Sequence, residues 1–263
     1  ARARSEASGA FGDDRVYLEK AIARPRHVEV QVIGDHHGNV LHLFERECSI
    51  QRRHQKVIEE SPSPALTPEL RRRMGELAVA LARRTGYVNA GTLEFLVGED
   101  REPCFLEMNT RLQVEHPVTE LVTGLDLVAL QIDVAEGRPL PATLLESVPL
   151  RGHAIELRLC AEDPNHGYRP SSGRFHTVRF PAIDGVRIDS AVESGSVVSP
   201  YYDSMIAKVI AHADTRGQAI RKARAALVGA ELIGPITNRD LLVELLSWLD
   251  EVQVGGASFA RLV

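Results

Sequence analysis

Polar and apolar side chains alternate over residues 107–116, and the rest of the sequence is best understood around this stretch. Its odd positions carry charged or amide side chains, while its even positions up to Val114 are apolar or threonine. Successive side chains of an extended strand point to opposite faces, so the odd positions would share one face at intervals of about 6.6 Å. Such a face is typical of either a solvated strand or a line of functional groups, and its mixed chemistry favours the second. Its members are Glu107, Asn109, Arg111, Gln113 and Glu115.

A strand is predicted at residues 92–97, and it forms a hairpin with the start of the alternating stretch. If the hairpin closes symmetrically, Leu96 faces Phe105. Glu94 then lies opposite Glu107, and like charges that face each other across a ladder are destabilising unless a cation neutralises them. Mg²⁺ takes carboxylate and amide oxygens and completes its shell with phosphate and water. The sequence therefore predicts a metal and phosphate platform made of Glu94, Glu107 and Asn109.

The remaining pattern predicts further helices and strands. The clearest helix begins at Thr67, a capping residue followed by Pro68 and an acidic residue, and it ends near Gly86. Its apolar stripe comprises Leu70, Met74, Leu77, Ala78 and Leu81. Other predicted helices lie within residues 1–14 and at 125–135, 217–232 and 238–248. Predicted strands lie at 16–22, 28–32, 40–46, 152–161, 174–180, 186–192 and 204–213.

The composition is that of an ordinary water-soluble protein. The chain has 263 residues, of which 44% are hydrophobic and 25% charged, with a net charge of −5. This length suits one large or two modest domains. No apolar run approaches the roughly 18 residues of a membrane span, and no charged-then-apolar amino-terminal segment predicts secretion. Acidic and basic residues are interspersed, so no nucleic-acid partner is predicted.

The three cysteines bear on the compartment. Cys48, Cys104 and Cys160 are far apart in the sequence and form no CxxC pair. They predict reduced thiols in a cytosol-like compartment and no zinc site, so we expect a cytoplasmic location. Burial as small apolar side chains is more typical of such residues than a nucleophilic role.

A dense basic cluster lies shortly before two prolines. It is typical of a solvated face, but beside a metal and phosphate platform it also has the composition of an anion clamp. Composition alone leaves both interpretations open. The cluster consists of Gln51, Arg52, Arg53, His54 and Lys56.

Residues 138–149 predict a linker, because three prolines there separate apolar residues. Beyond it the pattern is mostly that of strands. In the first of these, apolar and polar positions alternate, so Arg158 stands on the opposite face from the apolar set. The chain opens at Ala1 without a methionine, and we expect it to be a fragment of a longer protein.

Several motifs stand in a characteristic order along the chain. They are YLEK at 17–20, PRHVEVQ at 25–31, QRRHQK at 51–56, GTLEF at 91–95, EMNTRLQVEHP at 107–117, GHA at 152–154, AEDP at 161–164 and YYDSM at 201–205. Together they make the chain similar to the biotin carboxylase component of biotin-dependent carboxylases, a member of the ATP-grasp superfamily. Any one motif alone would be weak, but the set spans nearly the whole chain and is specific.

The resemblance implies an α+β fold in two parts. Residues 1–137 would be the C-terminal part of an ATP-grasp domain, an antiparallel sheet with helices. After the linker at 138–149, residues 150–263 would form a smaller, strand-rich biotin carboxylase C-terminal domain. The amino-terminal domain and the Gly-rich phosphate loop of the family are not in this sequence. We therefore expect the isolated chain to be inactive or nearly so.

The resemblance also implies a role for each candidate residue. Mg²⁺ or Mn²⁺ held by Glu94, Glu107 and Asn109 would bridge the ATP phosphates. Glu115 would be the general base that deprotonates bicarbonate for attack on the γ-phosphate, which gives carboxyphosphate. The implied ATP contacts are Glu19, Lys20, Ile22, His27, His54, Glu94 and Glu107.

The anionic substrates have their own implied contacts. Lys56 and Arg111 would act in catalysis together with Glu115, and Arg158 with Arg111 would stabilise the enolate-like charge on biotin. With the metal platform beside it, the basic cluster is then better interpreted as an anion clamp than as a solvated face. The implied bicarbonate contacts are Lys56, Arg111, Gln113 and Val114. The implied biotin contacts are Arg158 and Arg111.

The implied activity is the ATP-dependent carboxylation of biotin by bicarbonate. This is the first half-reaction of a biotin-dependent carboxylase such as acetyl-CoA or propionyl-CoA carboxylase, and the former belongs to fatty acid biosynthesis. Biotin would arrive on a carboxyl carrier domain, and a carboxyltransferase subunit and a second copy in a homodimer are further implied partners. Two alternatives are a ligase of the carbamoyl phosphate synthetase type, which does not account for the region carrying Arg158, and a non-catalytic nucleotide- or partner-binding module.

Overall fold

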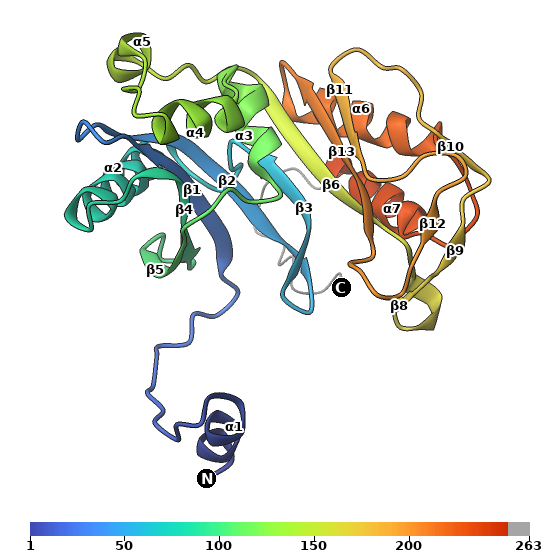
Figure 1. Cartoon of the computed structure of the whole chain (residues 1–263), viewed down its shortest axis with the longest axis horizontal. Coiled ribbons are helices and arrows are strands. Elements are labelled where there is room, and N and C mark those ends of the chain that lie inside the picture. Colours follow the sequence, from blue (N-terminus) through green and yellow to red (C-terminus); the bar gives the residue numbers. More distant parts are fainter. Residues whose placement is uncertain (252–263) are drawn as a thin grey trace.

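One eight-stranded antiparallel sheet runs through the computed structural model, which describes residues 1–251 (Figure 1). The strand order is β11-β13-β6-β3-β2-β1-β4-β5. The strands are β1 (Arg26–Gly34), β2 (Val40–Arg52), β3 (Gln55–Ser61), β4 (Asn89–Val97), β5 (Pro103–Asn109), β6 (His153–Cys160), β11 (Val186–Ser190) and β13 (Met205–Ala213). The predicted α+β class with an antiparallel sheet is confirmed.

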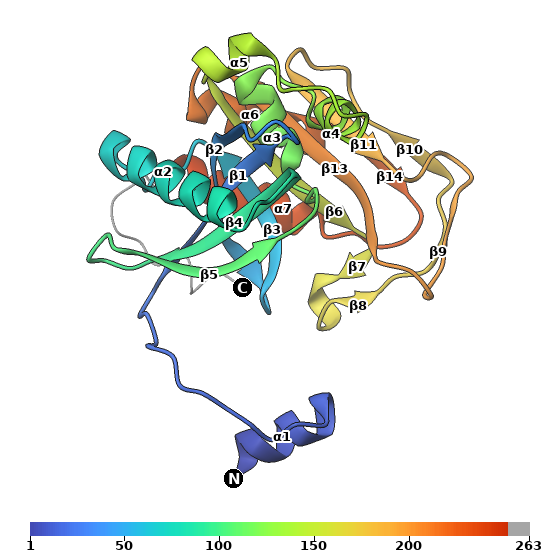
Figure 2. The same cartoon turned by 60° about the vertical axis from the view of Figure 1, so that its left-hand side comes forward.

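Helices cover both ends of this sheet. They are α2 (Pro68–Arg84), α3 (His116–Thr123), α4 (Leu127–Ala135), α5 (Ala142–Glu146), α6 (Arg216–Val228) and α7 (Arg239–Glu251). A further helix, α1 (Arg2–Phe11), lies apart from the sheet near the N-terminus (Figures 1 and 2). Short elements complete the second half of the chain: β7 (Glu162–Asp163), a 3-10 turn (Pro164–His166), β8 (Arg169–Pro170), β9 (Gly173–Arg174), β10 (Thr177–Arg179), β12 (Val197–Val198) and β14 (Glu231–Ile233). Among the described residues, no helix is both long and apolar enough to cross a membrane.

Helix α2 packs on the face of β1 and β2, and Thr67 caps it by accepting a hydrogen bond from the backbone N–H of Leu70. The predicted stripe is partly wrong, because Leu77 and Leu81 remain 39% and 37% exposed. The buried face instead includes Gly75, where an added Cβ would lie 2.6 Å from the ring of His42. The helix lies close to the sheet at this glycine, so the face that it buries carries smaller side chains than the predicted stripe.

Helices α6 and α7 pack on the opposite end of the sheet, behind β6 and β13 (Figure 1). The alternation in β6 works as predicted, since Ile155, Leu157 and Leu159 are buried in this core. Arg158 therefore points to the other face, where helix α3 and the loop before it lie.

Three predicted strands are not formed as expected. Residues 174–180 are divided between the short strands β9 and β10, which belong to different two-stranded sheets. Residues 16–22 are not a strand, and Leu18 is fully exposed, since a strand needs a neighbour to complete its hydrogen bonds and this segment has none among the described residues. The alternating row does not continue as one strand either: β5 ends at Asn109, a loop follows, and His116 begins α3. Pro117 suits the first turn of a helix, because its ring presets φ and it needs no N–H partner there.

The predicted linker at 138–149 contains the short helix α5 and is packed against the body. Leu140 and Leu144 are buried in a cluster with Ile33 and Leu43. The pairing of β3 with β6 carries the sheet across this segment, so the two halves share one set of strands. The division into two domains stays a prediction, and the last residues of the second one, 252–263, lie outside the described residues.

Candidate active site

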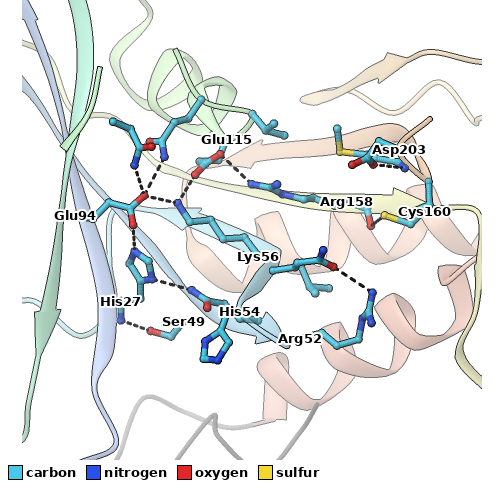
Figure 3. Close-up of a pocket in the computed structure, with 18 of the residues that line it drawn as sticks. His27, Ser49, Arg52, His54, Lys56, Glu94, Glu115, Arg158, Cys160 and Asp203 are labelled. Carbon is cyan, nitrogen blue, oxygen red and sulfur yellow. Dashed lines mark hydrogen bonds and ion pairs between the residues drawn. The ribbon is translucent and has the colours of Figure 1, made fainter. Parts of the chain in front are cut away.

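A cavity of about 810 Å³ opens where the N-terminal and C-terminal strands of the sheet meet (Figure 3). Strands β1, β3, β4, β5 and β6 and the loop before α3 all contribute to its wall. Most of the residues predicted to act in catalysis or binding line it. They are His27, His54, Lys56, Glu94, Glu107, Asn109, Arg111, Gln113, Val114, Glu115 and Arg158.

The register of β4 and β5 places Glu94 opposite Glu107, as predicted from the sequence. A bulge between Glu94 and Phe95 then shifts the register by one residue, so Phe105 faces Phe95 instead of the predicted Leu96. The carboxylates are therefore paired across the ladder even though the hairpin does not close symmetrically.

Glu94 is 5% exposed and accepts hydrogen bonds through both of its oxygens. Its Oε2 lies 2.7 Å from Nε2 of His27. Its Oε1 accepts from Lys56 at 3.1 Å, from Asn109 at 2.9 Å and from Gln113 at 3.0 Å. Burial alone would raise the pKa of Glu94, but the hydrogen bond from His27 and the charge of Lys56 lower it to about 2.

Lys56 is the cation at the centre of the site. Its Nζ donates to Glu115 at 2.6 Å and to Glu94 at 3.1 Å (Figure 3). It also donates to Glu29 at 2.6 Å, so one ammonium joins three carboxylates from different elements. Burial would lower the pKa of Lys56, but the surrounding anions raise it above its ordinary value. Lys56 therefore stays charged at any physiological pH.

Arg46 lies beneath this cation, with no exposed surface, and the sequence alone did not identify it. Its Nε donates to Glu29 at 2.6 Å, and its Nη2 donates to Oε1 of Gln113 at 3.0 Å. The other donors reach Gln31, Thr92 and Thr119, so all five N–H groups have partners. Because Arg46 occupies the amide oxygen of Gln113, the amide nitrogen is turned toward Glu94.

Glu115 is 2% exposed and lies between two cations. Its Oε1 accepts from Lys56 at 2.6 Å, and its Oε2 accepts from Arg158 at 2.9 Å. Arg158 also donates through Nε to Glu59 at 2.6 Å. The guanidinium is thus held by two carboxylates, and their charges keep the pKa of Arg158 above the ordinary value despite burial.

Glu59 and Glu156 form a second layer of acid groups that the sequence did not reveal. They face each other across β3 and β6 and are fully buried. Burial raises the pKa of Glu59 to about 7, although Arg158 opposes the shift. Burial and the nearby Glu59 raise the pKa of Glu156 well above its ordinary value, and neither oxygen of Glu156 has a hydrogen-bond partner within residues 1–251.

The predicted adenine contacts lie apart from this cluster. Glu19 and Lys20 are exposed in the extended segment that leads from α1 to β1, and they are not among the residues that line the cavity in the described chain (Figures 1 and 2). Ile22 lies beside Gly98, near the end of β4. Arg111 lines the cavity, where it donates to the carbonyl oxygen of Leu112 at 3.2 Å.

The donor set fits a hard divalent cation. Glu94 and Glu107 face each other across the ladder, and Asn109 ends the same strand, so two carboxylates and one amide are gathered at one place in the wall. Such oxygen ligands are those that Mg²⁺ and Mn²⁺ take beside phosphate. When bound there, the metal would neutralise charge on the phosphates of a nucleotide.

The antiparallel sheet with its helices has the ATP-grasp type of fold that the chain shares with solved biotin carboxylases. Residues 1–143 match the family model described as "Carbamoyl-phosphate synthase L chain, ATP binding domain", and residues 156–253 match "Biotin carboxylase C-terminal domain". The chain belongs to the biotin carboxylase family.

Curated relatives are about half identical to the chain. It is 50% identical over 241 residues to the biotin carboxylase of Halalkalibacterium halodurans, which covers 92% of this chain and 53% of that protein. It is also 50% identical over 244 residues to the mitochondrial methylcrotonoyl-CoA carboxylase subunit alpha of Rattus norvegicus, covering 92% of this chain and 34% of that one. The chain thus spans a third to a half of the length of these relatives.

A solved structure shares the fold over nearly all of the chain. It is the biotin carboxylase domain dimer of 2-oxoglutarate carboxylase from Hydrogenobacter thermophilus, in complex with MgADP, ADP and bicarbonate. The TM-score is 0.88 at 46% identity, over 94% of this chain and 54% of that one.

Proposed function

We propose that this chain is the part of a biotin carboxylase that activates bicarbonate with ATP and transfers the carboxyl group to biotin. The observation that carries the proposal is the position of Glu115 between Lys56 and Arg158 in the wall of the cavity. A base between two cations suits a reaction whose substrates are all anionic, because the cations offset the repulsion that the carboxylates alone would exert.

The first step uses Glu115 as the general base. Lys56, Arg111, Gln113 and the Val114 backbone would hold bicarbonate, and Glu115 would take its proton. The bicarbonate oxygen then attacks the γ-phosphorus of ATP, the bond to the bridging oxygen breaks, and ADP leaves. The product is carboxyphosphate.

The second step transfers the carboxyl group. Carboxyphosphate separates into CO₂ and phosphate, and the phosphate takes the proton from N1 of biotin. N1 then forms its bond to CO₂, and Arg158 with Arg111 would stabilise the negative charge on the ureido oxygen while the N1 proton is absent.

The nucleotide contacts are proposed on the same footing. Glu94, Glu107 and Asn109 would hold Mg²⁺ or Mn²⁺ beside the phosphates, and His27 and His54 line the cavity where the nucleotide would bind. Glu19, Lys20 and Ile22 are proposed adenine contacts, although in this structure the first two are exposed and outside the cavity wall. Binding of the nucleotide would have to bring the segment at 15–25 to it.

The proposal extends to the partners of the chain and to the class of carboxylase, which would be one that acts on an acyl-CoA. Relatives named as acyl-CoA carboxylase alpha chains support a carboxylase that also uses a biotin carrier domain and a carboxyltransferase subunit. The dimer in the Hydrogenobacter structure supports a homodimer. The acyl acceptor and a role in fatty acid biosynthesis stay predictions, and so does the cytoplasmic location, since some relatives are named as mitochondrial.

The test is ADP formation by the natural protein that contains this segment, with Mg·ATP and bicarbonate, with and without free biotin. We expect biotin to stimulate the rate. Glu115→Gln and Arg158→Ala should each lower the stimulated rate by about 100-fold or more, as for loss of a general base or of a group that stabilises transition-state charge. Matched controls are Arg179→Ala and Glu231→Gln, which remove an exposed ion pair elsewhere in the same half and should leave the rate unchanged.

Two outcomes would contradict the proposal. Stimulation by ammonia instead of biotin would favour a ligase of the carbamoyl phosphate synthetase type. The family model that matches residues 1–143 is named after that enzyme. Binding of Mg·ATP without any phosphate release would favour a non-catalytic module.

A further inference from the structure

Lys208 contacts the loop at 110–115, which carries the proposed bicarbonate contacts, from the same face of the sheet as Arg158. It lies on β13, paired with Arg158 of β6, and its side chain is 11% exposed. Its Nζ donates to the carbonyl oxygen of Val114 at 2.7 Å. The cavity wall contains Val114 and Glu115, so the ammonium holds the backbone of the wall from behind.

The position of this bond matters because residues 110–115 lie between β5 and α3 and pair with no strand of the described chain. The carbonyl of Gln113 accepts from the backbone N–H of His116 at 3.3 Å, and it also lies 2.8 Å from Nδ1 of that ring. The next carbonyl, that of Val114, accepts from Lys208. The peptide that joins Val114 to Glu115 is therefore fixed by a side chain from a strand more than 90 residues later in the chain.

The surroundings of Lys208 keep its ammonium in place. Oδ2 of Asp189 lies 3.4 Å from Nζ, and Oε2 of Glu156 lies 3.8 Å from it. Asp189 is itself held by Arg187, whose Nε donates to it at 2.8 Å. A hydrogen bond from a charged donor in such a buried setting is stronger than one between neutral groups.

We propose that Lys208 is a positioning residue for the bicarbonate site: by fixing the Val114–Glu115 peptide, it sets where the Val114 backbone and the Glu115 carboxylate meet the anion. This inference rests on the proposed function for the identity of the anion. It assigns no contact between Lys208 and substrate, so Lys208 acts only through the loop.

A purely structural role for Lys208 makes a different prediction. If the bond only helped to dock α3 on the sheet, its loss would lower the stability and affect nucleotide and bicarbonate alike. If it positions the loop, its loss should weaken bicarbonate binding and leave the binding of Mg·ADP unchanged, because the proposed nucleotide contacts lie on β1, β4 and β5, in the turn before β3 and in the segment at 15–25.

The experiment measures the affinity of the full natural protein for bicarbonate in the presence of Mg·ADP, by titration calorimetry. We expect Lys208→Met to weaken bicarbonate binding by about tenfold or more, in the range seen when an outer partner of a binding group is lost. The affinity for Mg·ADP should stay within about twofold. Lys208→Arg, which keeps the charged donor, should restore part of the loss.

The matched control is Lys222→Met. Lys222 is also part-buried and donates to a backbone carbonyl, that of His212 at 3.2 Å, on the same strand β13. It should leave bicarbonate affinity unchanged. Hydrogen exchange of the peptide covering residues 110–118 provides the second readout, and it should be faster in Lys208→Met than in the wild type or in Lys222→Met.

Each result decides between the two hypotheses. Unchanged bicarbonate affinity in Lys208→Met overturns the inference even if the protein is less stable, and so does an equal loss for both ligands. Weaker bicarbonate binding with faster exchange at 110–118 supports it. A third result separates the inference from the proposed function. If Lys208→Met weakens bicarbonate binding relative to the wild type, but biotin does not stimulate ADP formation by the wild type, the proposed function fails and the inference stands.

Discussion

Two pairs of buried glutamates face each other across neighbouring strands of the same sheet, and they differ in protonation. Glu29 of β1 lies opposite Glu94 of β4, and Glu59 of β3 lies opposite Glu156 of β6. All four are at most 5% exposed. In isolation, either pair would be destabilising, because like charges directly opposite each other repel.

The first pair is ionised because cations and donors surround it. Burial raises the pKa of Glu29, but the charges of Arg46 and Lys56 outweigh it and lower the pKa to about 2. The pKa of Glu94 is also lowered to about 2, for the reasons given above. Both carboxylates are therefore charged at pH 7 and available to a cation.

The second pair has fewer partners, so burial prevails. The pKa of Glu59 rises to about 7 even with Arg158 beside it, and the pKa of Glu156 rises further. Within residues 1–251, the ion-pair partner of Glu156 is Lys208, whose Nζ lies 3.8 Å from Oε2, beyond hydrogen-bond distance. Two glutamates directly opposite each other can therefore be charged or can hold a proton. Which of the two occurs depends on the cations and hydrogen-bond donors that the neighbouring strands supply.

The largest expected effect comes from removing the cation of the first pair. Lys56→Met leaves Glu29, Glu94 and Glu115 without their shared ammonium, and breaking a buried ion pair in this way costs about 3–5 kcal/mol. Biotin-dependent ADP formation should also fall to background. Urea unfolding at pH 5 and pH 8 checks the first point, and the ADP assay checks the second.

The pH dependence of that loss has a definite sign. Lys56 lowers the pKa of Glu29 and of Glu94, so without it the pKa of both carboxyls rises in the folded state and the folded protein binds protons more readily than before. The variant should therefore be most destabilised at pH 8 and less so at pH 5, where proton uptake relieves the repulsion. A loss of stability that is equal at both pH values would show that the carboxylates are not coupled to Lys56.

Removing one charge from the first pair should affect chemistry more than stability. Glu94→Gln keeps the shape of the side chain and one acceptor oxygen, but it replaces the other acceptor by a donor and removes a charged ligand from the proposed metal site. Because loss of an outer partner of a metal site already costs 10–100-fold, we expect activity to fall by about 100-fold or more.

The matched control for Glu94→Gln is Glu102→Gln. Glu102 lies in the turn of the same hairpin and pairs with Arg73 at the surface. Activity should be unchanged in this control. Partial recovery of Glu94→Gln at high Mg²⁺ or Mn²⁺ concentration, measured as ADP formation, would support a role in metal binding. Full activity at low metal concentration would contradict it.

The smallest expected effect is a gain in stability from the second pair. Glu156→Gln is isosteric, and its amide can donate to Oε2 of Glu59, which has no hydrogen-bond partner within residues 1–251. Replacing the unsatisfied carboxyl should stabilise the protein by about 1 kcal/mol at pH 8. Urea unfolding measures this gain, and Glu146→Gln, at an exposed position on α5, is the control.

The sign of this effect follows from the raised pKa of Glu156. Between the ordinary pKa of a glutamate and the higher folded value, the folded state holds a proton that the unfolded state has released, so wild-type stability falls as the pH rises through this window. The advantage of Glu156→Gln should therefore shrink toward pH 4.5. A loss of stability at pH 8 would instead mean that Glu156 is ionised and paired with Lys208.

The local part of the site could be predicted from the sequence. The opposition of Glu94 and Glu107 follows from the period of two in a hairpin, and Thr67 followed by Pro68 marks a helix start by chemistry that acts within a few residues. The bulge after Glu94 could not be predicted, because it shifts the register without leaving a sign in the polar and apolar pattern.

The second layer of the site escaped sequence reasoning because its contacts join distant strands. Arg46 and Glu29 look like solvated positions of alternating strands until β1 is known to lie between β2 and β4. Glu156 and Lys208 become neighbours of the cavity only through the pairing of β6 with β3 and β13. The sequence did contain one signal of these buried contacts, which is the excess of charged residues at the positions of these strands that face inward.

The pairing of β3 with β6 has a consequence for how the chain is made. During synthesis β3 is complete more than 90 residues before β6 exists, so for that time it is a bare edge with free backbone donors and acceptors. Glu59 and Glu60 lie in the middle of that edge, and inward-pointing charges discourage other strands from adding to it. When β6 and α6 arrive, His153, Arg158 and Arg216 neutralise them. Charge at Glu59 and Glu60 would thus discourage edge-to-edge aggregation of the nascent chain until β6 pairs with β3.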